Sequence, residues 1–510
     1  MRRVHRRLVG ALGLLIAGCT ASCTVGPDYQ APPPVATPAS YKEAPASEVG
    51  IWQPARPADG APRGKWWEAF GDPVLNGLEA QVLVANQDLK VAEARFRQAR
   101  ALIGVQRANE YPTVATAPSV GSVRDSAHQP YFFNHPHPSP TGDFQLPLDL
   151  TYEIDLWGRV RRSVQAAREE AQATEADLET ARLSLQAELA MDYVELRSAD
   201  AQQKLLNDTV AAFADALELT ENRLNGGAAP ESDVAQAQTL LETTRVQATD
   251  VAVARAQFEH ALAVLVGKPP GDFSLPPAPW TLEPPVVPAG VPSELLQRRP
   301  DIAAAERRVA EANEQIGIAE AAFYPTLTLA GTGGFIGTAL TNTFVYPSFA
   351  WSIGTTMTQT LFDAGRRRAQ SEAALANFDA TVAQYRSTAL TAFQEVEDNL
   401  SALQILAREG RQQKTAIAAA ENSLRLFTDR YVGGLDTYLQ VVTAQTALLS
   451  NQRNDVDLRR RHIEADILLV KALGGGWSDH ELPPLKARDP HMFEVRLPGT
   501  GSGLVPASTE

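Results

Sequence analysis

The sequence predicts an internally duplicated α+β membrane protein in which long helical hairpins are joined to four β-strands per chain. Three observations support this fold class. The two halves of the 510-residue chain repeat the same motifs in the same order. Each half contains a long proline-free run of helix-forming residues with a heptad pattern, and each contains about ten residues in which apolar and polar side chains alternate.

The composition excludes several classes of protein. Apolar residues make up 44% of the chain, which is enough to bury hydrophobic cores. The net charge of −14 argues against nucleic-acid binding, which needs basic surfaces. The chain has two cysteines, Cys19 and Cys23, so a disulfide framework or a cysteine metal cluster in the body is excluded. No stretch reaches the ~18 apolar residues of a membrane-spanning helix.

Residues 1–22 are predicted to be a lipoprotein signal peptide. Four arginines precede a short apolar run at residues 8–17, which is too short to span a membrane. Small residues follow and lead directly into Cys19, and Cys23 is a second candidate four residues later. Cleavage before either cysteine removes the four arginines and changes the net charge from −14 to −18. We therefore expect an exported protein that is lipidated at Cys19 or Cys23.

Proline-rich segments mark the boundaries of the remaining parts. The predicted parts are an extended N-terminal arm (23–66), a first repeat (67–268), a proline-rich linker (269–293), a second repeat (294–476) and an irregular C-terminal tail (477–510).

The two repeats keep a common register. Residues 88–112 resemble residues 301–325 at an offset of 213 positions. The Gly-Arg pair at 158–159 and the Gly-Gly pair at 226–227 recur at an offset of 207 positions. A chance resemblance would not hold its register over more than a hundred residues, so the chain is an internal duplication.

Residues 159–225 have the pattern of one long helix. They contain no proline, and Leu189, Leu196 and Val210 share a heptad position, while Leu206 and Phe213 share a second one. Such a helix would be about 100 Å long at 1.5 Å per residue. The run ends at a double glycine and returns as residues 232–265, and the second half repeats this arrangement, with its return helix at residues 437–473. Each half is therefore predicted to be an antiparallel helical hairpin with its tip at the glycines.

The strands are predicted where the hairpins end away from their tips. Residues 146–156 and 349–361 alternate apolar with polar or small side chains, as strands of a membrane barrel do. Weaker strands are expected at residues 113–123 and 326–335. A soluble sheet with one buried face is the alternative interpretation. Four strands cannot close a barrel, and open edges are unfavourable in lipid, so a membrane sheet requires two chains (eight strands) or three (twelve).

Several motifs resemble the TolC family of outer-membrane efflux proteins, in its NodT-type lipoprotein branch. They are CTVGPDY from Cys23, WW at 66–67, FGDP at 70–73, LPLDLTYEIDLWGR at 146–159, RRPD at 298–301, AFYP at 322–325 and LFDAGR at 361–366. The resemblance covers nearly the whole mature chain. It implies a homotrimer with a twelve-stranded barrel in the outer-membrane lipid, a helical tunnel across the periplasm and an equatorial belt. It also implies a periplasmic adaptor and an inner-membrane RND-type transporter as partners. In the family the acylated cysteine directly precedes the Gly-Pro-Asp-Tyr run, which favours Cys23.

The resemblance also implies a gate and a docking surface at the hairpin tips. The family often carries an acidic ring in a Leu-Asp-Ala-Gln segment, but here Thr443 stands where that aspartate is common. The nearest acids are Asp436 and Asp233, and Leu439 could form an apolar constriction. The alternative is that both aspartates cap the returning helices. The predicted adaptor-docking residues are the tip glycines Gly226, Gly227, Gly433 and Gly434.

The predicted function is a passive outer-membrane exit duct for drugs or other toxic small molecules. We find no nucleophile–base set and therefore predict no enzyme activity and no cofactor. We also predict no resident metal, because His135 and His137 lack carboxylate neighbours. The alternative is a surface-anchored, adhesin-like trimeric coiled coil without conduction. Strands with opposed faces in both halves favour the duct.

Overall fold

The structure is a computed structural model that describes residues 24–33, 41–43, 64–124, 140–283 and 298–475. The predicted signal peptide, Cys19, Cys23, the two loop histidines and the predicted C-terminal tail beyond residue 475 lie outside the described residues.

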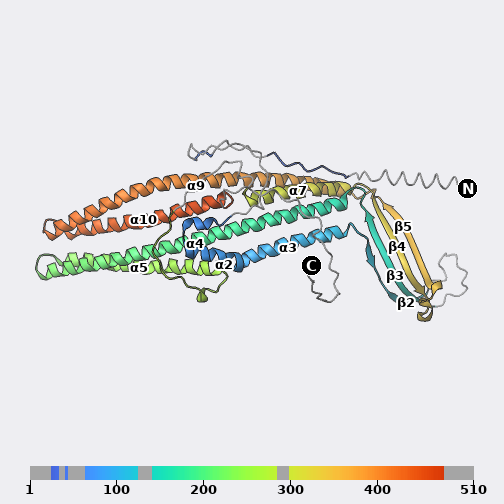
Figure 1. Cartoon of the computed structure of the whole chain (residues 1–510), viewed down its shortest axis with the longest axis horizontal. Coiled ribbons are helices and arrows are strands. Elements are labelled where there is room, and N and C mark those ends of the chain that lie inside the picture. The colour runs from blue at the N-terminus through green and yellow to red at the C-terminus, as the bar shows by residue number, and fades with distance from the viewer. Residues whose placement is uncertain (1–23, 34–40, 44–63, 125–139, 284–297, 476–510) are drawn as a thin grey trace, which may run out of the picture.

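The molecule is elongated, with two helical hairpins side by side and one sheet at the end opposite to their tips (Figure 1). Each hairpin pairs a very long helix with a shorter one, and further helices pack along the half nearest to the sheet. The helices are η1 (Trp66–Phe70), α2 (Pro73–Ala85), α3 (Gln87–Ala108), α4 (Arg159–Asn225), α5 (Glu231–Leu265), η2 (Pro270–Asp272), α7 (Pro300–Ala321), α8 (Leu340–Thr343), η3 (Tyr346–Ser348), α9 (Arg366–Val432) and α10 (Tyr438–Ala472).

The duplication predicted from the sequence is confirmed at the level of helices. The long helices α4 and α9 both have 67 residues, and the return helices α5 and α10 both have 35. The helices that precede the strands, α3 and α7, both have 22 residues. Each long helix begins after a glycine with a positive φ, and at Gly158 an added Cβ would lie 2.8 Å from the Thr24 side chain. The N-terminal arm therefore passes close to the start of α4.

The sheet is antiparallel. Its strands are β1 (Thr113–Ala115), β2 (Ser119–Val123), β3 (Thr141–Ile154), β4 (Thr326–Gly337) and β5 (Phe349–Thr358). The order is β1-β3-β4-β5, and β2 pairs with β3 beyond the end of β1. β1 and β2 thus fill one position, and the sheet is four strands wide.

One strand prediction needs correction, because residues 113–123 do not form one continuous strand. The ladder to β3 breaks between Ala115 and Ser119, where Pro118 has no N–H to donate. The Thr116 hydroxyl bridges the gap by donating a hydrogen bond of 2.6 Å to the Pro147 carbonyl. On the other side of β3, Gly334 is required because an added Cβ would lie 2.2 Å from the Leu146 carbonyl oxygen.

The hydrophobic core follows the seams between helices rather than filling a globule. The largest cluster joins η1 and α2 to the middle of α4 and to the end of α10, around Tyr193, Leu196 and Ile467. A second cluster joins α7, α9 and the N-terminal arm, and smaller ones follow the hairpins toward their tips. The heptad leucines Leu189 and Leu196 are buried, as the pattern predicts. Among the described helices, none combines the length and apolar character needed to cross a membrane.

Candidate functional site

The two faces of the sheet differ in chemistry. Because opposite residues in an antiparallel register share a face, Leu148, Gly333 and Trp351 lie on one face, and so do Leu150, Gly331 and Ile353. Large apolar side chains on this face are exposed; Trp351 is 70% exposed and Ile353 is 67% exposed. Exposed apolar side chains in this number fit contact with lipid.

The opposite face is polar. It carries threonines, serines and the acids Asp143, Asp149 and Glu153. The Thr332 hydroxyl donates a hydrogen bond of 2.7 Å to Asp149 across the strand pair, and Glu153 forms an ion pair of 2.6 Å with Arg159 at the start of α4. This face fits contact with water.

The sheet does not close on itself within the described strands. β5 pairs only with β4, and the β1–β2 position pairs only with β3. Both edges therefore offer backbone N–H and C=O groups to a further strand.

At the tips, the two hairpins are joined by a compact cluster. The Tyr431 hydroxyl of α9 donates a hydrogen bond of 3.2 Å to the buried Asp233 carboxylate of α5. Arg223 of α4 donates a hydrogen bond of 2.9 Å to the Val432 carbonyl, and its guanidinium lies 4.7 Å from the centre of the Tyr431 ring. The Tyr438 ring packs against the Tyr431 ring with 5.1 Å between the ring centres and a tilt of 58°, and burial raises the pKa of Tyr438 to about 12. We call Arg223, Asp233, Tyr431 and Tyr438 the tip cluster.

The other three predicted gate residues do not join the tip cluster. Asp436 forms an ion pair of 3.1 Å with Arg430 and accepts a hydrogen bond of 2.9 Å from the Thr437 N–H. Leu439 is exposed, and the Thr443 hydroxyl donates a hydrogen bond of 2.8 Å to the Leu439 carbonyl. The structure thus places Asp233 against the second hairpin, whereas Asp436 stays within its own turn.

The tip glycines have unequal roles. Gly227 and Gly434 have φ values of +73° and +71°, whereas Gly226 and Gly433 have φ values of −81° and −74°. Only the second glycine of each pair therefore needs the left-handed conformation that glycine tolerates. The backbone hydrogen bonds at both tips follow the Schellman pattern, with Leu435 N–H donating to the Arg430 carbonyl at 2.9 Å.

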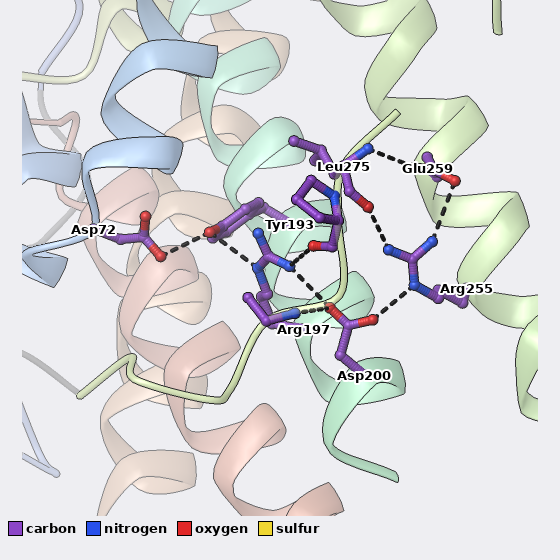
Figure 2. Close-up of polar contacts among 9 residues, drawn as sticks. Asp72, Tyr193, Arg197, Asp200, Arg255, Glu259 and Leu275 are labelled. Atoms are coloured by element: carbon purple, nitrogen blue, oxygen red, sulfur yellow. Dashed lines mark hydrogen bonds and ion pairs between the residues drawn. The ribbon is translucent and has the colours of Figure 1, made fainter. Parts of the chain in front are cut away.

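Halfway along the first hairpin lies a polar network that the sequence reading missed. Figure 2 shows Asp200 of α4 between two arginines: its carboxylate forms ion pairs of 2.8 Å with Arg197 and 2.7 Å with Arg255 of α5. Arg255 also forms an ion pair of 3.2 Å with Glu259. We call Arg197, Asp200, Arg255 and Glu259 the equatorial ion cluster. Its signal in the sequence is two pairs of an arginine and an acid, Arg197–Asp200 and Arg255–Glu259, spaced three and four residues apart. Such pairs are common on helix surfaces, so the sequence alone does not show that these two pairs meet between α4 and α5.

The equatorial ion cluster also holds the linker and α2. Arg197 donates to the Pro276 carbonyl at 3.1 Å, and Arg255 donates to the Leu275 carbonyl at 2.5 Å (Figure 2). Tyr193 accepts a hydrogen bond of 3.0 Å from Arg197 and donates one of 2.7 Å to Asp72, which caps α2. Such buried charges are stable only when paired, so this network fixes its helices firmly.

The N-terminal arm is fixed beside the sheet. The Val25 N–H donates a hydrogen bond of 3.0 Å to the Trp157 carbonyl, and Arg162 donates one of 2.8 Å to the Val25 carbonyl. The first described residue, Thr24, directly follows Cys23. Within the described residues, no group of three or more His, Cys, Asp or Glu side chains could hold a metal ion.

A sheet with an apolar outer face and open edges, joined to long helical hairpins, defines a class of outer-membrane protein with a helical extension. Residues 78–268 and 291–475 match the model of the outer membrane efflux protein family. The toluene efflux pump outer membrane protein TtgF of Pseudomonas putida is 32% identical over 489 residues, which cover 94% of this chain and 99% of that protein. The pyoverdine export outer membrane protein OpmQ of Pseudomonas aeruginosa is 32% identical over 81% of this chain and 87% of that protein.

Solved structures agree. The outer-membrane channel OprN superposes with a TM-score of 0.80 and 30% identity, covering 89% of this chain and all of that one. The outer membrane protein VceC from Vibrio cholerae superposes with a TM-score of 0.75 and 30% identity, covering 81% and 99%. The chain belongs to the outer membrane efflux protein family. It is an outer-membrane channel component of an efflux system, and the adhesin-like alternative is not supported.

Proposed function

We propose that three copies of this chain form a closed duct that carries toxic small molecules out of the cell, gated at the periplasmic hairpin tips. A periplasmic adaptor docks at the tips, and an inner-membrane RND-type transporter supplies the energy. The duct itself is passive and performs no catalysis. The observation that carries the proposal is that residues buried on α4 in the first repeat have equivalents on α9 in the second repeat that are exposed.

In the first repeat, the long helix α4 is covered on two sides, by α3 and by α7. Ala176 of α4 packs against Ala303 and Ala304 of α7 and is 1% exposed. The equivalent residue of α9, 207 positions later, is Ala383, and it is exposed. Likewise Leu183 of α4 is 5% exposed, whereas its equivalent Leu390 is 55% exposed.

The equivalence of the two repeats indicates which helix of a neighbouring copy would cover the exposed face of α9. Since α7 is the repeat-equivalent of α3, the helix that would follow α9 around a ring is α3 of a second copy. Val91 of α3 is 48% exposed, whereas its equivalent in α7, Ala304, is 1% exposed. The open faces of α9 and α3 are thus complementary ends of one interface, and a ring of copies covers both.

The same ring pairs the edges of the sheet. β5 of one copy would accept the β1–β2 edge of the next, which leaves no unpaired backbone in lipid. Three copies give a twelve-stranded barrel, a size within the range of closed membrane barrels. The apolar face of the sheet then contacts lipid and the acidic, polar face lines the lumen.

We assign closure of the duct to the tip cluster together with the exposed Leu439. The hydrogen bond from Tyr431 to Asp233 ties the second hairpin to the first one, so it opposes separation of the tips. Asp436, held by Arg430, lies next to this point and would set a preference for cations at the mouth.

The transported molecules are proposed to be drugs, solvents or similar toxic compounds. Relatives are named for toluene, antibiotic and pyoverdine export, so the duct fold accepts chemically different cargo. The choice of cargo would then rest largely with the inner-membrane partner.

Lipidation at Cys23 completes the proposal. Because Val25 is bonded to the Trp157 carbonyl at the foot of the sheet, a lipid on Cys23 would start next to the membrane. Cys19 remains the alternative acceptor. Mass spectrometry of the mature N-terminal peptide distinguishes the two.

The assembly and conduction are tested together. The detergent-solubilised protein should run as a trimer in native mass spectrometry and should form channels in planar bilayers. Deletion of the gene should raise sensitivity to toxic small molecules, and the adaptor should co-purify with the trimer. A stable monomer that forms no channels would refute the proposed duct.

A further inference from the structure

Each hairpin has an equivalent hydrogen bond at the C-terminal end of its return helix, which is the end away from the tip. In the first repeat Asn86 donates a hydrogen bond of 2.9 Å to the Leu265 carbonyl at the end of α5. In the second repeat Arg299 donates one of 3.2 Å to the Ala472 carbonyl at the end of α10. These residues are repeat-equivalents, so the hairpins begin from the same anchor.

Two to three turns closer to the tips, the two hairpins differ. The equatorial ion cluster of the first hairpin is replaced in the second by residues that cannot reproduce it. At the 207-residue offset, the positions of Arg197, Asp200, Arg255 and Glu259 are occupied by Gln404, Ala407, His462 and Asp466.

At these four positions the second hairpin has no counterpart of the equatorial ion cluster. Asp466 is 3% exposed, and its Oδ2 atom has no hydrogen-bond partner within the described structure. Leu406, Leu458 and Ala465 supply apolar contacts between α9 and α10 instead. At this level the first hairpin is thus held by the equatorial ion cluster, whereas the second combines apolar packing with an ion pair of 2.5 Å between Arg460 of α10 and Glu195 of α4.

The N-terminal arm binds the second hairpin where the linker binds the first. Gln404 donates a hydrogen bond to the Glu43 carbonyl, just as its equivalent Arg197 donates one to the Pro276 carbonyl of the linker. The Glu397 carboxylate of α9 accepts hydrogen bonds of 2.7 Å from the Lys42 N–H and 3.0 Å from the Glu43 N–H. Tyr41 is buried in the core cluster that contains Val396.

Elsewhere the same arm is bonded to helices that do not belong to the second hairpin. Arg162 of α4 donates to the Val25 carbonyl at 2.8 Å, and Asn313 of α7 donates to the Pro27 carbonyl at 3.1 Å. Tyr29 donates a hydrogen bond to Glu306 of α7. The described parts of the arm therefore contact three helices: residues 24–33 contact α4 and α7, and residues 41–43 contact α9.

We propose that arm residues Tyr41, Lys42 and Glu43 are a releasable latch on the second hairpin, held by Glu397 and Gln404 of α9, and that release of this latch favours opening of the duct. We call this contact the arm latch. The arm can leave α9 without breaking a helix or exposing a buried charge pair, whereas the linker of the first hairpin cannot. Because Tyr41 packs in one buried cluster with Ile302 of α7 and Val396 of α9, movement of α9 away from α7 would pull this contact apart, so an intact latch opposes that movement. The proposal rests on the proposed duct.

The first test removes the bonds of the latch one at a time. Glu397→Ala deletes the acceptor of two N–H groups, Gln404→Ala deletes the bond to the Glu43 carbonyl, and Glu397→Gln keeps one acceptor oxygen. Glu421→Ala, at an exposed glutamate of the same helix, is the matched control. Hydrogen–deuterium exchange of the trimer should be faster at Lys42 and Glu43 in the first two variants, intermediate in Glu397→Gln and unchanged in the control.

The functional readout is the ratio of open to closed time of single channels in planar bilayers. Bonds of this kind, made to a charged group, typically contribute enough to change an equilibrium about tenfold. We therefore expect the open-to-closed ratio to rise about tenfold in Glu397→Ala, less in Glu397→Gln, and not in Glu421→Ala. Native mass spectrometry verifies that each variant is still assembled.

A reversible lock tests the opposite direction. Glu43→Cys combined with Gln404→Cys places two thiols at the arm latch, and oxidation should lower the open-to-closed ratio below that of the unmodified protein. A reducing agent should restore it. Each cysteine variant alone should be insensitive to both treatments.

The outcomes separate this proposal from the proposed function. If the unmodified protein forms no channels, the duct itself is refuted. If it forms channels and the arm exchanges faster in Glu397→Ala while the open-to-closed ratio is unchanged, the arm is only a structural brace. An unchanged exchange rate at Lys42 and Glu43 would show that the latch contact does not exist.

Discussion

At the scale of single residues, the function of the tips depends on bonds between positions far apart in sequence. Asp233 and Tyr431 are separated by 198 residues; Asp233 belongs to the first hairpin and Tyr431 to the second. Their neighbours in sequence do not reveal the pair, because Asp233 by itself resembles an acid in the first turn of a helix. Tertiary placement of the two hairpins is needed to bring them together.

Tyr431→Phe removes the hydroxyl that bonds to Asp233 and leaves the ring in place. The buried carboxylate then loses a donor, which should favour separation of the tips and raise the open-to-closed ratio by about five- to tenfold. Single-channel recording measures the ratio. Tyr438→Phe is the control, because among the described residues its hydroxyl makes no hydrogen bond to Asp233. Equal effects of the two substitutions would contradict the assignment.

Glu79 of α2 predicts a dependence of stability on pH. The residue is 0% exposed, neither carboxylate oxygen has a partner in the described structure, and burial raises its pKa to about 9. Between the ordinary pKa of 4.5 and about 9, the folded state keeps a proton that the unfolded state releases. Stability should therefore fall as the pH rises through this window, by at most about 1.4 kcal/mol per pH unit.

Glu79→Gln removes this titration while keeping the shape of the side chain. The variant should lose less thermal stability than the unmodified protein between pH 5 and pH 8, as followed by circular dichroism in detergent. Glu93→Gln, at an exposed position of α3, should leave the pH dependence unchanged. An identical pH dependence in Glu79→Gln would mean that the buried carboxyl is solvated or paired in the assembled protein.

At the scale of elements, the helices were more predictable than the strands. The bounds of α4 follow from the sequence because a glycine stands at each end of a 67-residue run without proline. The sequence does not reveal the break between β1 and β2, because Val114 and Val120 on either side of Pro118 are both compatible with one strand, and only the ladder to β3 reveals the gap. The equatorial ion cluster was missed because its two arginines come from different helices.

The tip turns give a prediction that separates two adjacent glycines. Gly434→Val forces a β-branched residue into the left-handed conformation, at a cost of about 1–2 kcal/mol or more, whereas Gly433 already has a helical φ. Cross-linking to the adaptor should fall clearly in Gly434→Val and only slightly in Gly433→Val, with trimers preserved in both. If both variants cross-link like the unmodified protein, the tips turn the chain and do not contact the adaptor.

At the scale of the whole molecule, the duplication both defines the fold and exposes what one chain lacks. The sequence repeat predicts two equivalent hairpins and an open sheet, and comparison of equivalent residues then shows which faces remain uncovered. The number of chains in the ring depends on the angle between neighbouring repeats, so it does not follow from which residues are exposed. That angle is a property of the packed helices rather than of any pattern in the sequence.

Ala383→Arg tests the uncovered face of α9. A substitution of an exposed alanine on a helix is usually nearly neutral, but Ala383 corresponds to the buried Ala176 of α4. We expect the arginine to reduce the trimer fraction strongly in native mass spectrometry. Ala376→Arg is the control, since its equivalent Glu169 already carries a charged side chain at a half-buried position. Trimers at the normal level in Ala383→Arg would place the interface elsewhere.

The equal lengths of the paired helices restrict how this gene can change. Because α4 and α9 both span 67 residues and α5 and α10 both span 35, the two tips end at the same depth. An insertion in one hairpin alone would leave its tip out of level with the other and would separate Asp233 from Tyr431. A heritable change in the reach of the molecule must therefore alter four helices together. Removal of one heptad from each would shorten it by about 10 Å and keep every seam in register.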